Sequence, residues 1–160
     1  MIRLITPTDI SACVALIRES FATVAHEFGI TKENAPRFTA FAMSEERLRW
    51  QYEQGRPMFV YTDRVGNIIG YASLEIKTGG VCELNNLCVS PDRRHQGVGG
   101  ELLSYAVEIA REHGCTRMML GMVEENTVLR RWYENAGFVH THTEKFDFFP
   151  FTCGYMERIL

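Results

Sequence analysis

The chain has 160 residues, of which 46% are apolar and 23% charged, a composition typical of a folded globular protein and unlike that of a disordered one. This length favours a single domain over residues 1–160 with its own hydrophobic core. The formal net charge of −3 provides no general attraction to nucleic acid or to an anionic membrane, so we expect neither as a partner and any anion site must be local.

The cysteine pattern and the lengths of the apolar stretches indicate the compartment. Five cysteines are scattered along the chain and never form a C-x-x-C pair, which supports neither a disulfide framework nor a zinc knuckle. His140 and His142 alternate as on one strand, a spacing more typical of a solvated face than of a chelate, and we expect no metal. No stretch approaches the roughly 18 apolar residues of a spanning helix. We therefore expect a cytoplasmic protein.

The first third of the chain predicts a strand and two helices with an irregular segment between the helices. Ile2 to Thr6 is short, partly β-branched and followed by proline, as expected of a strand that ends in a turn. Apolar residues from Ile10 to Val24 then recur at helical spacing. His26 to Phe41 loses this periodicity, which predicts an ordered loop or a broken helix. Ser44 begins a second helix that runs to about Glu53.

Three strands and a helix are predicted next. The strands are Met58 to Thr62, Ile68 to Ile76 and Val81 to Val89, and the turn formers between them indicate an antiparallel meander. A helical stripe of apolar residues follows from Val98 to His113, and Gly114 stands where a left-handed C-terminal cap is needed.

The last third of the chain predicts a crossover strand, a helix and a hairpin. Cys115 to Val123 is almost continuously apolar, as expected of a strand that is buried on both faces and reached by a helical crossover. A helix from Val128 to Asn135 follows, and the chain ends in two extended segments, Phe138 to Phe149 and Cys153 to Leu160. The fold class is therefore α/β with a mixed sheet.

The turn between the strand ending at Val89 and the helix beginning at Val98 predicts an anion site, because glycines there expose the first backbone N–H groups of the helix. A P-loop would carry lysine and a hydroxyl residue after the last glycine, where Gly100-Glu101 stands. A dinucleotide fingerprint would carry glycine at the position of Leu102. Taken alone, the turn also fits glycines that only relieve backbone strain.

Two motifs of this sequence resemble those of the GCN5-related N-acetyltransferase (GNAT) family and occur in the same order along the chain. The run from Leu87 to Gly99, followed by Leu102-Leu103, is similar to the acetyl-CoA motif of that family, and Asn126 to Phe138 is similar to a second motif at the family's spacing. The resemblance covers nearly the whole chain. It implies a mostly antiparallel central sheet with a splayed parallel pair of strands and about four helices, and acetyl-CoA as the cosubstrate whose acetyl group passes to a primary amine.

The resemblance also assigns the catalytic residues. Tyr133 matches the family tyrosine that protonates the leaving thiolate, and Glu83 stands where several members carry a general base that acts directly or through water. A solvated strand carboxylate is the alternative interpretation of Glu83. On an unbroken strand Glu83 would share a face with Leu87 and Val89, whereas a bulge at Asn85-Asn86 would shift that phase.

The cofactor-binding residues follow from the same motifs. The second half of the strand is expected to pair with the pantetheine arm and the turn to hold the diphosphate. The expected residues are Leu87, Cys88, Val89, Arg94, His95, Gln96, Gly97, Val98, Gly99, Gly100, Asn126 and Tyr133.

The acceptor is expected to be a small-molecule or peptide amine. His26 to Phe41 and Phe146 to Thr152 are predicted to line its pocket. Two other functions stay open, a CoA-binding sensor or non-catalytic domain and a transferase that uses another acyl-CoA donor. A homodimer is a family-level expectation.

Overall fold

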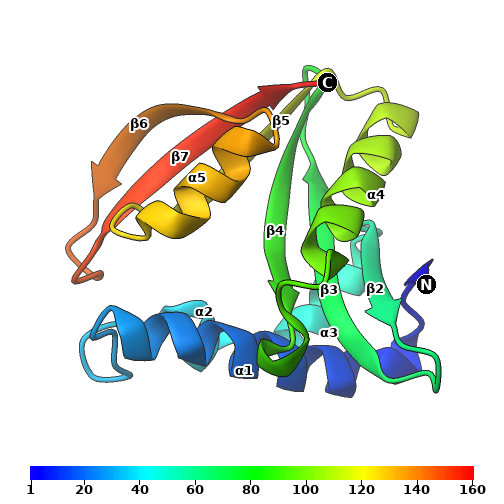
Figure 1. Ribbon diagram of the computed structural model, residues 1–160, viewed down its shortest axis with the longest axis horizontal. Helices are drawn as coiled ribbons and strands as arrows, with labels where there is room; N and C mark the ends of the chain where they lie inside the picture. The colour runs from blue at the N-terminus through cyan, green and yellow to red at the C-terminus, as the bar shows by residue number, and fades with distance from the viewer.

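The computed structural model describes all 160 residues, which form one seven-stranded sheet in the order β1-β2-β3-β4-β5-β7-β6 (Figure 1). All neighbouring strands run antiparallel except β4 and β5, which are parallel. The strands are β1 (Ile2–Leu4), β2 (Met58–Thr62), β3 (Ile68–Ile76), β4 (Val81–Val89), β5 (Arg117–Val123), β6 (Val139–Lys145) and β7 (Thr152–Ile159).

Five α-helices accompany the sheet, one more than the four or so expected. The additional helix is the single turn α2, which lies in the segment predicted to be a loop or a broken helix. The other helices begin and end close to their predicted bounds. The helices are α1 (Ile10–Glu27), α2 (Thr39–Ala42), α3 (Glu45–Glu53), α4 (Val98–Glu112) and α5 (Thr127–Asn135), with 3-10 turns at Pro7–Asp9 and Pro91–Arg93.

Two hydrophobic clusters lie on the two faces of the sheet. The larger joins α4 to the central strands, with Leu102 packed among residues such as Leu74. The second joins α1 and α3 to the opposite face, where Ile17 and Leu48 share a cluster with Tyr71. A third, smaller cluster joins the α1–α2 connection to the β6–β7 connection. The β4–β5 junction therefore lies between helices that pack on opposite faces of the sheet.

Strand β5 corrects one expectation. The sequence predicted a strand buried on both faces, but only Met118, Leu120 and Val123 of β5 are buried, whereas Arg117 and Gly121 are exposed. The cause lies in the helix layer, because α1 and α3 cover the half of the sheet that contains β1 to β4 and do not extend over β5 (Figure 1). The uncovered face of β5 is available to line a cavity.

The five cysteines form no disulfide bond. All five cysteines are free and four are buried. Burial raises the pKa of Cys13 and Cys88 to about 12, so both thiols stay protonated and act as small apolar side chains. None of the helices combines the length and apolar character needed to cross a lipid bilayer.

Candidate active site

The parallel strands β4 and β5 separate after a short paired section. Val81–Glu83 pairs with Arg117–Met119, and beyond Glu83 the two strands share no register. The edge of β4 that faces β5 is therefore open from Leu84 onward. The splayed parallel pair that the resemblance implied is confirmed, and it leaves strand backbone available to an extended ligand.

A β-bulge turns β4 at the point where it leaves β5. Tyr71 of β3 pairs with Cys88 and Ser73 with Asn85, so two steps along β3 face three along β4. The residue after Asn85, Asn86, has φ 55, a left-handed conformation that asparagine adopts more readily than most residues. The bulge predicted at Asn85-Asn86 is thus present.

The bulge exchanges the faces to which the side chains of β4 point. Before it Cys82 and Leu84 belong to the α4 cluster, and after it Leu87 packs against that cluster while Cys88 belongs to the α1 cluster. Glu83 therefore lies on the α1 and α3 face, opposite to Leu87, although an unbroken strand would place the two side chains together.

A cavity of about 530 Å³ occupies the opening between the splayed strands. Its walls come from β4, β5 and α5, from α1, from the start of α2 and the connection before it, from α3 and from the β6–β7 hairpin. The segments predicted to line the acceptor pocket contribute to it. Residues that line it include Glu83, Asn85, Asn86, Leu87, Leu120, Met122, Asn126, Tyr133, Arg37, Phe38, Phe149 and Phe151.

Glu83 places a carboxylate on the wall of this cavity. Its Oε2 lies 2.9 Å from Lys77 Nζ, and about a third of the Glu83 side chain is exposed. The hydrogen bond with Glu83 raises the pKa of Lys77. A partly solvated carboxylate next to an open strand edge can accept a proton from a bound amine, either directly or through water.

Tyr133 lines the same cavity near the end of α5. Its ring packs edge-on against Trp132 and Phe138, with centroid distances of 5.0 and 5.4 Å. Burial raises the pKa of the Tyr133 hydroxyl, and no hydrogen bond to a protein group offsets that effect. The hydroxyl is therefore protonated at neutral pH and free to donate to a ligand atom.

Asn126 begins α5 and also faces the cavity. Its Oδ1 accepts a hydrogen bond from the Leu129 N–H at 3.2 Å, which makes it the helix cap that the sequence predicted. The cap and the aromatic packing hold α5 against the opening, and Tyr133 with it.

The turn from β4 into α4 presents an unusual run of free donors. Gly97 is the N-cap of α4 with φ 85, and His95 has φ 63. None of the backbone N–H groups from His95 to Gly100 donates to another group of the protein. The side chain of Val98 is buried in the α4 cluster, so that residue offers its N–H alone. Such a run of N–H groups at a helix N-terminus suits the oxygens of a diphosphate.

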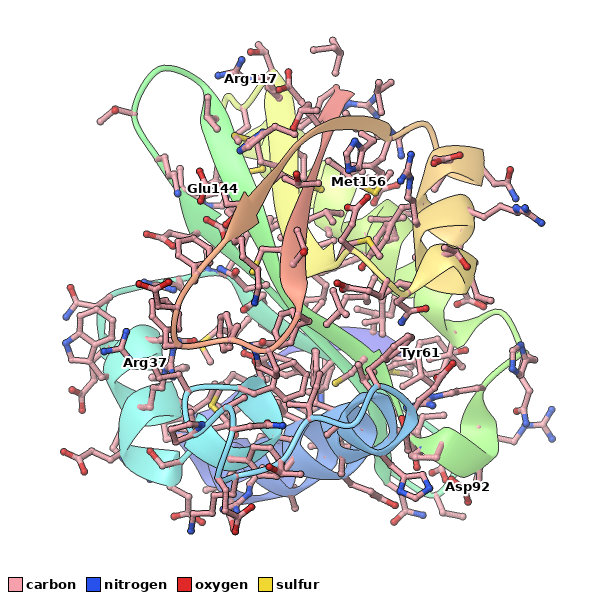
Figure 2. All side chains as sticks on the ribbon, turned by 90° about the vertical axis from the view of Figure 1, so that its left-hand side faces the viewer. Arg37, Tyr61, Asp92, Arg117, Glu144 and Met156 are labelled. Atoms are coloured by element: carbon pink, nitrogen blue, oxygen red, sulfur yellow. The ribbon has the colours of Figure 1, made fainter.

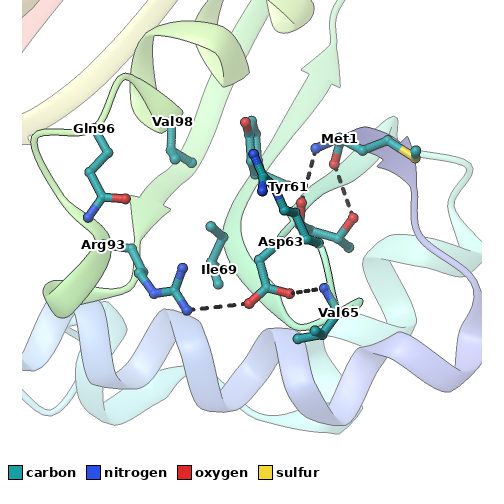
Figure 3. Close-up of a pocket in the computed structure, with 10 residues that line it drawn as sticks. Met1, Tyr61, Asp63, Val65, Ile69, Arg93, Gln96 and Val98 are labelled. Atoms are coloured by element: carbon teal, nitrogen blue, oxygen red, sulfur yellow. Dashed lines mark hydrogen bonds and ion pairs between the residues drawn. The ribbon is translucent and has the colours of Figure 1, made fainter.

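Two arginines hold this turn in place. The Arg94 guanidinium donates to Thr23 Oγ1 at 3.0 Å and to the carbonyls of Ser20 and Val89 at 3.1 and 3.2 Å. Arg93 extends the other way, and its Nη2 lies 3.4 Å from Asp63 in the β2–β3 turn (Figure 3). Both guanidinium groups are thus engaged within the protein, whereas the backbone N–H groups from His95 to Gly100 are free to donate.

A second cavity, of about 670 Å³, lies beside the turn and is drawn in Figure 3. It is lined by Arg93, Gln96 and Val98 together with residues of β2 and the β2–β3 turn. Neither Tyr133 nor Glu83 borders it, so we place the chemistry in the smaller cavity between the splayed strands.

The structure also shows cavity residues that the sequence did not indicate. Arg47, Trp50 and Gln51 of α3 and Arg56 after it line the cavity. Gln51 is 7% exposed, and its Oε1 accepts no hydrogen bond. The helix was predicted, but its periodicity does not reveal that this face borders the cavity.

Replacing Gly97 with valine is expected to weaken CoA binding by about tenfold, because a β-branched residue at φ 85 is strained by about 1–2 kcal/mol and the N–H groups lose their arrangement. Calorimetric titration with CoA measures the change. Gly114→Val is the matched control, because Gly114 has φ 77 and open surroundings at the other end of α4. Equal affinity in both variants would show that the turn does not hold the ligand.

Known proteins share this sequence pattern and this fold. The model of the acetyltransferase (GNAT) family matches residues 26–138. An uncharacterized N-acetyltransferase in the pepI 3′ region of Lactobacillus delbrueckii subsp. lactis is 25% identical over 145 residues, which cover 83% of this chain and 80% of that protein.

Two solved structures have a similar fold. The PaiA N-acetyltransferase from Thermoplasma acidophilum, in complex with coenzyme A, superposes with a TM-score of 0.84 at 22% identity over 100% of this chain and 98% of that one. A phosphinothricin acetyltransferase from Sinorhizobium meliloti, in complex with acetyl-CoA, superposes with a TM-score of 0.78 at 22% identity. The superposition covers 100% of this chain and 88% of that one. With the family model matching more than half of the chain, the protein belongs to the acetyltransferase (GNAT) family, whose members are acetyl-CoA-dependent N-acetyltransferases.

Proposed function

We propose that the protein transfers the acetyl group of acetyl-CoA to a primary amine that binds in the cavity between β4 and β5. The observation that carries the proposal is the junction of three features at one opening, namely the unpaired edge of β4, the Glu83 carboxylate and the Tyr133 hydroxyl. Acetyl-CoA supplies an activated acetyl group in the form of a thioester.

The chain's own residues fit this cosubstrate. The free N–H groups from His95 to Gly100 face the diphosphate, and the open edge of β4 around Leu87 and Cys88 supports the pantetheine arm. A backbone N–H at this edge polarises the thioester carbonyl, because it is fixed where negative charge develops. Arg94 acts on the site by fixing the turn to α1.

Proton transfers before and after the attack accompany the reaction. A lysine-like amine has a pKa of about 10.4 and arrives protonated at neutral pH, so Glu83 accepts a proton directly or through water before the nitrogen attacks the thioester carbon. A carbon–nitrogen bond forms, the carbon–sulfur bond breaks, and Tyr133 donates its hydroxyl proton to the departing sulfur. The nitrogen, which carries two protons after the attack, loses one of them to solvent as the amide forms, and Tyr133 regains a proton from solvent.

Acceptor-dependent release of CoA tests this function. The purified protein is incubated with acetyl-CoA and a panel of primary amines, and free CoA and acetylated product are measured by mass spectrometry. We expect release to require an amine. Tight binding of acetyl-CoA without release for any amine would contradict the proposal and favour a CoA sensor. Competition by succinyl-CoA would identify a different acyl donor.

A further inference from the structure

The acceptor end of the cavity carries an excess of arginines. Arg37 precedes α2, Arg47 lies on α3 and Arg56 follows α3, and all three line the cavity. Glu75 and Glu83 are the carboxylates among the lining residues. A positively charged cavity is unexpected in a chain whose net charge is −3.

Both lining carboxylates already have cationic partners. Glu75 Oε2 lies 3.7 Å from Arg56 Nη1, and Glu83 Oε2 lies 2.9 Å from Lys77 Nζ. No carboxylate lies within ion-pair distance of Arg37 or Arg47. The positive charge of these two residues is therefore uncompensated at the mouth of the cavity.

Arg37 is held in a way that leaves its donors available. Its guanidinium carbon lies 4.5 Å from the centroid of the Phe148 ring, in the connection between β6 and β7. Figure 2 shows Arg37 near the level at which this connection approaches the helices. Stacking uses the flat face of a guanidinium, so the N–H groups in its plane stay free to bind a planar anion such as a carboxylate.

The cavity that these arginines and Glu83 line also has several aromatic side chains on its wall. Trp50 and Phe149 line it with other ring side chains. Gln51, one helical turn after Arg47, has a buried Oε1 without a hydrogen-bond donor, which a ligand N–H would satisfy.

From this arrangement, and resting on the proposed function, we propose that the acceptor is a small amine that also carries a carboxylate. Arg37 and Arg47 bind the carboxylate at the mouth, the aromatic wall contacts an apolar or aromatic spacer, and the amine reaches Glu83 and the open edge of β4. The charge of the mouth thus selects anionic amines over neutral amines of the same shape.

A matched pair of acceptors tests the inference. 4-(Aminomethyl)benzoate and 4-(aminomethyl)benzamide share one skeleton and differ in the carboxylate. We expect kcat/KM with acetyl-CoA to be about tenfold higher or more for the carboxylate, because hydrogen bonds to charged groups are stronger than neutral ones. The advantage should shrink as sodium chloride is added, because salt screens exposed charges.

Variants assign the preference to the two arginines. Arg37→Gln combined with Arg47→Gln should raise KM about tenfold for the carboxylate and leave that of the carboxamide unchanged. Arg49→Gln is the control, because Arg49 is exposed on the same helix and does not line the cavity. A preference that persists in the double variant, or equal kcat/KM for the two acceptors, would overturn the inference.

The experiment distinguishes failure of this inference from failure of the proposed acetyltransferase function. Acetylation of neutral amines alone would overturn the inference and leave the acetyltransferase activity established. If no amine releases CoA, calorimetric titration of the CoA-bound protein with the same two amines still decides, because carboxylate-dependent binding supports the inference and equal or absent binding overturns it.

Discussion

Replacing Tyr133 with phenylalanine is expected to lower kcat by a factor of about 10² to 10³ while leaving the affinity for acetyl-CoA nearly unchanged. This decrease in kcat is typical of an enzyme that has lost its general acid. The ring keeps its packing against Trp132 and Phe138, and the hydroxyl makes no hydrogen bond in the protein, so the fold loses little. Steady-state kinetics and calorimetry measure the two quantities separately.

Tyr105→Phe is the matched control for this variant. Tyr105 also packs against the α4 cluster, with its ring 5.0 Å from that of Phe59, but it does not line the cavity between β4 and β5. We expect unchanged kcat for Tyr105→Phe. An unaltered rate in Tyr133→Phe would remove that residue from the chemistry, and a loss confined to binding would make it a contact residue.

The Glu83→Gln variant is expected to lose about 10²-fold in kcat at neutral pH, because glutamine cannot accept the proton of the amine. The deficit should shrink as the assay pH rises toward the pKa of the acceptor, since more of the amine then enters already deprotonated. The pH profile thus distinguishes a lost base from a lost contact, which would leave a constant deficit across the range.

A control is needed because Glu83 also pairs with Lys77 at 2.9 Å. Lys77→Gln breaks the same ion pair and keeps the carboxylate, and Lys77 does not line the cavity. Partly exposed ion pairs contribute little to stability, so both variants should fold. A similar loss of kcat in Lys77→Gln would show that the ion pair, and not a base at Glu83, is what the reaction needs.

Much of the fold was predictable because its signals are local. Alternation and turn formers placed β2, β3 and β4 at their observed bounds, and the capping pattern around Asn126 and Gly137 enclosed α5. The segment with the single turn α2 was predicted only as a loop or a broken helix, since four residues are too few to show a helical period. The exposed face of β5 was also missed, because an apolar run does not reveal whether a helix covers it.

The candidate site was predictable only in part. The two motifs indicated Tyr133, Glu83 and the turn from Arg94 to Gly100, since each is a short pattern of residue types. They did not show that the Arg94 side chain reaches α1, because its partner Ser20 lies 74 residues away in the chain. The sequence suggested a bulge at Asn85-Asn86, but the face on which Glu83 lies depends on the pairing of β4 with β3.

The sequence by itself determined the order of the elements, the two motifs and the free donors at the start of α4, because periodicity, capping and glycine conformation act over a few residues. The tertiary structure alone decided where β4 leaves β5, what the arginine side chains contact and which charges at the cavity are unpaired. Arg37 and Arg47 became a feature of one site only when α2, α3 and the β6–β7 connection came together around it. This arrangement depends on packing between segments that are far apart in the chain, and local sequence patterns do not contain that information.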